Sequence, residues 1–186
     1  SKEVTSRIIG SLKKLEYRGY DSAGIATISE NNINEVKCEG RVNELEKNVN
    51  QIKLSGTIGI GHVRWATHGK PSTINAHPHS SDNVSVVHNG IIENSTILKK
   101  ILEKKGYKFK SQTDTEVIVH LVTDYLKKNN LKDTIIKVLK KLHGSFALGI
   151  IFKDQPDLII GARRGSPLAV GYGPDEHYLG SDSYAL

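Results

Sequence analysis

The sequence has 186 residues, 37% of them hydrophobic and 25% charged, a composition typical of one soluble globular domain. No stretch approaches the roughly 18 consecutive apolar residues of a membrane helix, and residues 1–10 lack a signal-peptide pattern, so we expect a cytoplasmic protein without membrane contact. The net charge of +6 lies largely in lysine pairs typical of solvated helix faces, and with 6% aromatic residues it does not indicate nucleic-acid binding.

The first half of the sequence predicts two helices and four strands. Val4, Ile8, Leu12 and Leu15 recur at helical spacing and predict an amphipathic helix that ends near Tyr17 and Gly19. The strands are predicted at 22–29, 34–40, 56–63 and 83–90, and the second, short helix at 42–49. Residues 64–80 have no periodicity and are rich in Gly, Pro, Ser and His, so we expect a long ordered loop there. Loops of that length in compact domains are usually functional or disordered.

The second half predicts three helices followed by four strands. The helices are expected at 93–105, 114–128 and 131–143, and the second begins with a capping box of Thr113 and Glu116. The strands, which follow at short spacing and indicate an antiparallel meander, are expected at 145–152, 157–163, 167–173 and 176–182. Helices grouped between strand-rich ends favour an α+β fold, with layered sheets covered by helices, over alternating βαβ units.

Five histidines, the only tryptophan and an arginine lie between residues 61 and 90. The histidines are His62, His68, His77, His79 and His88. Their spacing matches no zinc-binding motif, and Asp82 is the only carboxylate in the span, so we expect no metal and no cofactor. His62 and His88, at the ends of predicted strands, are expected to be buried hydrogen-bonding residues.

The remaining residues of this span favour a pocket for a small molecule. Arg64 has the planar fork that binds a carboxylate, and Trp65 beside it can cover a small ligand and exclude water. Asn89 and Gly90, at the end of a strand, offer an amide side chain next to an unhindered backbone N–H, as a developing oxyanion requires. An isolated Asn-Gly pair is more often a turn, but this pair follows the arginine and histidine cluster.

Six segments resemble the glutaminase domain of the glutamine:fructose-6-phosphate amidotransferase family. They are LEYRGYDSAGIA (15–26), GHVRWATHGKPSTINAHPH (61–79), VVHNGIIEN (86–94), SQTDTEVIVHL (111–121), GSFALGI (144–150) and RRGSPLAVG (163–171). The resemblance runs from end to end and keeps its order. RWATHG followed by NAHPH and HNGIIEN resembles this sugar-phosphate branch more than the related class II amidotransferases that make phosphoribosylamine or asparagine.

The resemblance implies that residues 1–186 form one type 2 glutamine amidotransferase domain. Its fold would be α+β, the four-layer αββα sandwich of the N-terminal-nucleophile hydrolases. Such domains hydrolyse L-glutamine to glutamate and ammonia, and an isomerase domain of the same polypeptide uses the ammonia to aminate fructose 6-phosphate. We expect the full-length enzyme to be a homodimer.

The resemblance also implies residues for substrate binding and for the oxyanion hole. Arg64 would bind the α-carboxylate of glutamine, and Asp114 would bind its α-ammonium group. Asn89 and Gly90 would form the oxyanion hole, in agreement with the chemistry of the Asn-Gly pair.

The resemblance assigns four further residues to the glutamine subsite, to the loop over it and to the surroundings of the nucleophile. Thr67 and His77 would line the same subsite, Trp65 would lie on the loop that closes over glutamine, and Arg18 would sit near the nucleophile.

The nucleophile of the resembled family is a cysteine at the N-terminus of the mature chain, whose own α-amine acts as the general base. The sequence starts at Ser1, close to the first helix, so we expect a fold truncated at both ends, without the nucleophile, the last strands or the isomerase domain. Neither Ser1 nor the mid-strand Cys38 is expected to replace the cysteine, and the chain as given is expected to be inactive.

The alternative is a non-catalytic glutamine-binding or interaction module; the complete set of binding residues favours the enzyme.

Overall fold

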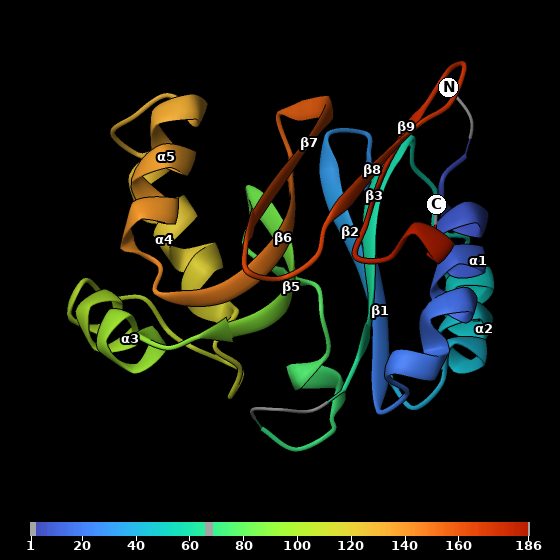
Figure 1. Ribbon diagram of the computed structural model, residues 1–186, viewed down its shortest axis with the longest axis horizontal. Helices are drawn as coiled ribbons and strands as arrows, with labels where there is room; N and C mark the ends of the chain where they lie inside the picture. Colours follow the sequence, from blue (N-terminus) through green and yellow to red (C-terminus); the bar gives the residue numbers. More distant parts are fainter. Residues whose placement is uncertain (1–2, 66–68, 186) are drawn as a thin grey trace.

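The computed structural model describes residues 3–65 and 69–185. Two antiparallel sheets stack face to face, and helices cover the outer face of each, so that four layers follow one another across Figure 1. Within the described residues, no helix is both long and apolar enough to cross a membrane. This arrangement confirms the α+β, four-layer αββα order expected from the sequence.

The first sheet has three strands in the order β2-β1-β3. Its strands are β1 (Ser22–Ser29), β2 (Asn32–Glu39) and β3 (Ile58–Arg64), and its helices are α1 (Thr5–Leu15) and α2 (Val42–Ile52). The central strand β1 is buried at seven consecutive positions, because one face packs on the helices and the other faces the second sheet. Ile25 packs with Leu12 and Leu45 on the helix side, whereas Ala26 packs with Ile151 of the second sheet.

The second sheet has four strands in the order β4-β5-β6-β7. Its strands are β4 (His79–Ser80), β5 (Val84–Ile92), β6 (Gly144–Phe152) and β7 (Gln155–Arg164), and its helices are α3 (Ser95–Lys104), α4 (Glu116–Leu126) and α5 (Leu131–Lys141). Alternate residues of β6 point to opposite faces, as the pleat requires. Phe146, Leu148 and Ile150 pack with the helices, and Ile151 packs toward the first sheet.

The last two strands form a separate hairpin of β8 (Ala169–Tyr172) and β9 (His177–Gly180), so the predicted four-stranded meander is wrong. Gly165 has a φ of 79°, and Pro167 has no N–H to donate, so the chain leaves the second sheet between β7 and β8. The hairpin is held to α1 instead, because Arg7 donates a 2.8 Å hydrogen bond to the Tyr178 hydroxyl. The final 3-10 turn, Ser183–Ala185, lies on the same helix, where Ser11 donates to the Ala185 carbonyl.

The predicted loop at 64–80 contains a short 3-10 helix, Thr73–Asn75, and the strand β4. Asn75 is buried and fastens this segment, because its side chain donates to the Lys70 carbonyl and accepts from the Gln112 backbone N–H. Residues near the start of α4 are thereby fixed against the segment that follows β3.

The predicted capping box of Thr113 and Glu116 is wrong. The chain folds back before α4, so the Glu116 carboxylate accepts backbone N–H groups of Lys110 and Ser111 at 2.8 and 2.7 Å, while Thr113 bonds to His79. Burial raises the pKa of Glu116, but hydrogen bonds from His120, Ser111 and these N–H groups outweigh burial and lower the pKa to about 2. Glu116 therefore anchors the segment that precedes α4.

We predict that Glu116→Gln lowers the free energy of unfolding by about 2 kcal/mol, because a neutral amide cannot replace a carboxylate that accepts several buried hydrogen bonds. Urea unfolding at pH 7 measures the change. Glu103→Gln, on the exposed surface of α3, is the matched control and should change the unfolding free energy by less than about 0.5 kcal/mol. Equal effects of the two substitutions would contradict the anchoring role of Glu116.

Candidate functional site

A cavity of about 1460 Å³ lies between the two sheets and is bounded by α1 and the β8–β9 hairpin. Seven of the eight residues expected at the site line it: Arg18, Arg64, Trp65, His77, Asn89, Gly90 and Asp114. The eighth, Thr67, lies outside the described residues. Polar residues at the ends of β3 and β5 occupy one part of the wall, and apolar residues of α1 and the sheets line the rest, so the cavity has a polar and an apolar region.

Arg64 is the last residue of β3 and is only 4% exposed. Its Nη2 donates to the Gly69 carbonyl at 3.1 Å, and its Nη1 lies 3.6 Å from Asp21 Oδ1. Burial lowers the pKa of the Arg64 guanidinium, and the negative charges of Asp21 and Asp114 oppose that shift. The structure therefore holds a buried cation on the cavity wall, in a planar group suited to a carboxylate.

Asp114 precedes α4 and is also buried. Its Oδ2 accepts the backbone N–H of Ile92 at 2.7 Å, and its Oδ1 lies 3.9 Å from His88 Nδ1. The hydrogen bond to Ile92 fixes the carboxylate against the end of β5. The cavity wall thus carries an acidic group and a basic group on different elements.

Asn89 and Gly90 lie in β5, opposite Ala147 and Phe146 of β6. They are not in a simple turn, which excludes the alternative reading of the Asn-Gly pair. Gly90 has a φ of 126°, and a Cβ at this position would lie 2.1 Å from the Ser145 carbonyl oxygen. Glycine is required there because a side chain has no space and the φ is unfavourable for other residues.

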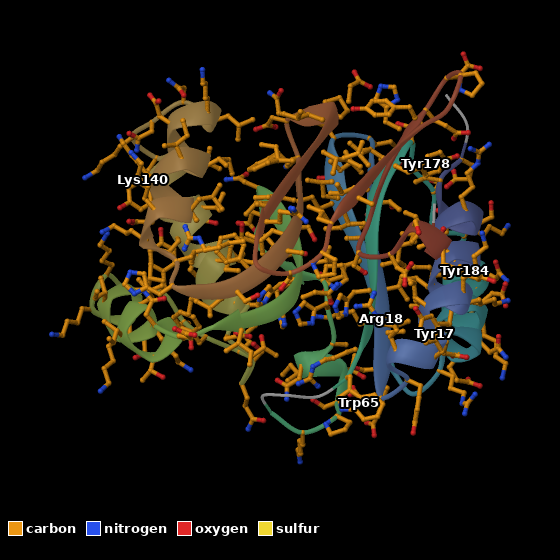
Figure 2. The ribbon with its side chains drawn as sticks, in the orientation of Figure 1. Tyr17, Arg18, Trp65, Lys140, Tyr178 and Tyr184 are labelled. Atoms are coloured by element: carbon orange, nitrogen blue, oxygen red, sulfur yellow. The ribbon has the colours of Figure 1, made fainter. Side chains whose placement is uncertain are left out.

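Trp65 and Arg18 lie at the rim of the cavity, and Figure 2 shows both side chains at the same end of the sheets. Trp65 is 62% exposed and makes an edge contact with Tyr20, with ring centroids 5.9 Å apart. Arg18 donates to Ser181 and lies 3.9 Å from Asp182. Both residues are placed where they can contact a molecule that enters the cavity.

A buried network of histidines and threonines supports these groups, and sequence reasoning did not identify its threonines as site residues. Thr115 Oγ1 lies 2.8 Å from His77 Nε2 and 2.9 Å from His88 Nδ1. Thr113 Oγ1 lies 2.9 Å from His79 Nε2. The two threonines flank Asp114 and hold it in place, and the sequence signal was their position in the TDT triplet of the resembled segment 111–121.

The four described histidines between residues 61 and 90 are hydrogen-bonded: His62, His77, His79 and His88. Where the chain is described, no group of three or more His, Cys, Asp or Glu side chains is arranged to hold a metal ion. His62 and His88 bond to Asn89 and Thr115, which confirms the hydrogen-bonding role expected for both. His68 lies outside the described residues.

Cys38 is not among the residues that line the cavity; it lies on β2 and packs in the core with residues of α2. Its side chain is 7% exposed, and burial raises the pKa of the thiol. A nucleophilic cysteine needs a low pKa and access to substrate, so Cys38 has the properties of a structural thiol.

Burial also sets the charge of the histidines. It lowers the pKa of His62 to about 4 and that of His79 to about 3, and it brings the pKa of His77 well below the usual value. Unfolded histidine has a pKa near 6.5. Below pH 6.5 the histidines of the unfolded chain bind protons, whereas the buried histidines of the folded chain do not. The free energy of unfolding is therefore highest above pH 6.5 and decreases as the pH falls.

We predict that the free energy of unfolding decreases between pH 7 and pH 5, with His62 and His79 each contributing about 1–2 kcal/mol and His77 acting in the same direction. Urea unfolding at the two pH values measures the difference. His79→Gln should make the pH dependence smaller, and the same substitution at exposed His177 is the control for loss of a histidine. A pH dependence unchanged by His79→Gln would contradict the assignment of a neutral, buried His79.

Residues 63–186 match the family model of the glutamine amidotransferase domain. The chain is 53% identical over 184 residues to a glutamine–fructose-6-phosphate aminotransferase (isomerizing) of Bradyrhizobium diazoefficiens, and 52% identical over 187 residues to one of Clostridium acetobutylicum. These alignments cover 98% and 100% of this chain but 30% and 31% of the two relatives. The chain thus spans just under a third of the length of the relatives it matches.

A solved structure of the glutamine phosphoribosylpyrophosphate amidotransferase of B. subtilis, complexed with ADP and GMP, is similar to this fold. The TM-score is 0.84 at 31% sequence identity, and the match covers 97% of this chain and 40% of that one. This match agrees with the four-layer fold of the N-terminal-nucleophile hydrolases. Because the family model covers more than half of the sequence and the fold agrees, the chain belongs to the glutamine amidotransferase domain family.

Proposed function

We propose that this domain hydrolyses the side-chain amide of L-glutamine to glutamate and ammonia. The observation that carries the proposal is the presence of a buried cation, a buried carboxylate and an Asn-Gly pair on one cavity wall. A free amino acid has an α-carboxylate and an α-ammonium group, which match Arg64 and Asp114 in charge. The amide carbonyl that becomes an oxyanion during hydrolysis matches Asn89 and Gly90.

The two charged residues would bind the amino-acid end of glutamine. Arg64 sits in a low-dielectric environment, where a charge-assisted hydrogen bond to a carboxylate is strong. Asp114 already accepts the Ile92 N–H, which leaves further lone pairs on the carboxylate for an ammonium group. With both ends of the amino acid held, the side-chain amide would extend toward the oxyanion donors in one orientation.

We propose that hydrolysis in the full protein uses a cysteine upstream of Ser1, as the resembled family does. The only cysteine of this sequence, Cys38, is buried away from the cavity and has a raised pKa. In the proposed reaction the α-amine takes the proton of the thiol in the same residue, and the sulfur attacks the amide carbon to form a tetrahedral intermediate. The amine then delivers a proton to the leaving ammonia, and water releases glutamate from the thioester.

We further propose that an isomerase domain of the same polypeptide uses the ammonia to aminate fructose 6-phosphate, and that the full protein is a homodimer. The names and the greater length of the two relatives support a fused second domain. A glutamine-binding module without catalytic activity is the less favoured function, because such a module has no need for a prearranged oxyanion pair.

We predict that Arg64→Ala weakens the binding of glutamate by about 10- to 100-fold, the effect of losing a hydrogen bond to a charged group. Isothermal titration calorimetry measures the dissociation constant. Arg41→Ala is the control, because Arg41 is exposed and lies outside the residues that line the cavity. Equal affinities of the Arg64→Ala variant and the unchanged protein would contradict the role of Arg64.

A second prediction concerns the nucleophile. The chain starting at Ser1 is expected to release no glutamate from glutamine, whereas a chain extended upstream to the expected cysteine releases it, with a rate several orders of magnitude higher. A coupled glutamate assay on both proteins measures the rates, after mass spectrometry has verified each N-terminus. Replacing the new cysteine by alanine is the control and should abolish turnover. Substantial turnover by the Ser1 form would show that another group is the nucleophile.

A further inference from the structure

A side-chain hydrogen bond joins the two sheets at the cavity wall. His62 lies on β3 of the first sheet, and Asn89 lies on β5 of the second. His62 Nε2 is 2.8 Å from Asn89 Oδ1. Both residues line the cavity, so the bond lies next to the proposed oxyanion donors.

The orientation of the Asn89 amide decides what it can do in the reaction. A carboxamide has a donating NH2 on one side and an accepting oxygen on the other. Only the NH2 can stabilise a negatively charged oxygen, and an amide turned the other way would repel it. Since Oδ1 faces His62, the Nδ2 group is directed away from the ring.

The histidine ring is itself held in position. It stacks on the ring of His77, with centroids 4.5 Å apart and planes inclined by 29°. His77 in turn bonds to the hydroxyl of Thr115, which is fully buried. Rotation of the His62 ring would therefore disturb a packed network.

Burial keeps the ring neutral at physiological pH, since it lowers the pKa of His62 to about 4. A neutral imidazole has one N–H group and one accepting nitrogen. Among the described residues the ring's Nδ1 is buried and has no hydrogen-bonding partner, whereas Nε2 faces Asn89 Oδ1, so a proton on Nε2 can be donated and a proton on Nδ1 cannot. With the proton on Nε2, the ring donates to Asn89 Oδ1; with the proton on Nδ1, it could only accept from Asn89.

We propose that His62 is a positioning residue that carries its proton on Nε2, holds Asn89 Oδ1, and so turns Asn89 Nδ2 toward the cavity as the oxyanion donor. This inference rests on the proposed glutamine hydrolysis for its kinetic consequence, but the tautomer and the amide orientation are properties of the resting protein.

The first test is therefore independent of activity. Two-dimensional NMR of the ¹⁵N-labelled chain, with the His62 resonances assigned by comparison with His62→Gln, reports which ring nitrogen carries the proton. The proposal predicts a neutral Nε2–H tautomer at pH 7. A neutral Nδ1–H tautomer would overturn it, because Asn89 would then have to present its oxygen to the cavity.

The second test is a double-mutant cycle in the full-length protein. His62→Ala should lower kcat for glutamine hydrolysis by about 10- to 100-fold and change KM by less than about threefold, because the amide loses its orientation while the amino-acid subsite stays intact. In an Asn89→Ala background the same change should have almost no further effect on kcat. His62→Gln, whose amide can also donate, should recover part of the rate.

The controls separate this inference from a structural effect and from the proposed function. His143→Gln removes an exposed histidine that does not line the cavity, and it should leave kcat unchanged. Additive losses in the cycle, or an unchanged kcat in His62→Ala, would overturn the positioning role. If the unsubstituted full-length protein does not hydrolyse glutamine, the proposed function fails, and the NMR measurement still decides the orientation of Asn89.

Discussion

Polar side chains buried between two β-sheets must find hydrogen-bonding partners, and most of the site in this domain follows from that requirement. An unpaired polar group in such a position costs roughly 1–3 kcal/mol, so each hydrogen bond formed there stabilises the arrangement of the site. Here the partners come from the opposite sheet or from the segment before α4. His62 on β3 bonds to Asn89 on β5, and His77 and His88 share Thr115.

Hydrogen bonds of this kind also fix the positions of the charged residues Asp114 and Arg64. Asp114 lies between two threonines that bond to histidines: Thr113 to His79 and Thr115 to His77. The Asp114 carboxylate itself accepts the Ile92 N–H. Arg64 ends β3 and is fixed by the Gly69 carbonyl. The acidic and the basic group are thus attached to two different rigid elements at one cavity wall, as a site that binds both ends of an amino acid requires.

Sequence reasoning found most of the fold and the chemically distinctive part of the site. Helical spacing located α1, and short runs of strand-forming residues bounded by turn residues located the strands, because these patterns are local properties of the chain. Arg64 and the Asn-Gly pair were identifiable from their chemistry and from the resembled segments, whereas Asp114 was identifiable only from the resembled segment 111–121. The capping box was wrong because Glu116 contacts a backbone that folds back in three dimensions, and the meander was wrong because a glycine and a proline redirect the chain after β7. The contact of Asp21 with Arg64 and the hydrogen bonds of Thr113 and Thr115 join segments that are distant in the sequence. No local sequence pattern predicts such contacts.

The central claim is that the cavity between the sheets binds an amino acid through its charged groups. A crystal structure of the domain with bound glutamate would test this claim most directly. The account predicts the α-carboxylate within hydrogen-bonding distance of Arg64, the α-ammonium group against Asp114, and the side-chain carboxylate directed toward Asn89 and Gly90. Glutamate bound in the reverse orientation, with its side chain on Arg64, or bound outside this cavity, would contradict the account.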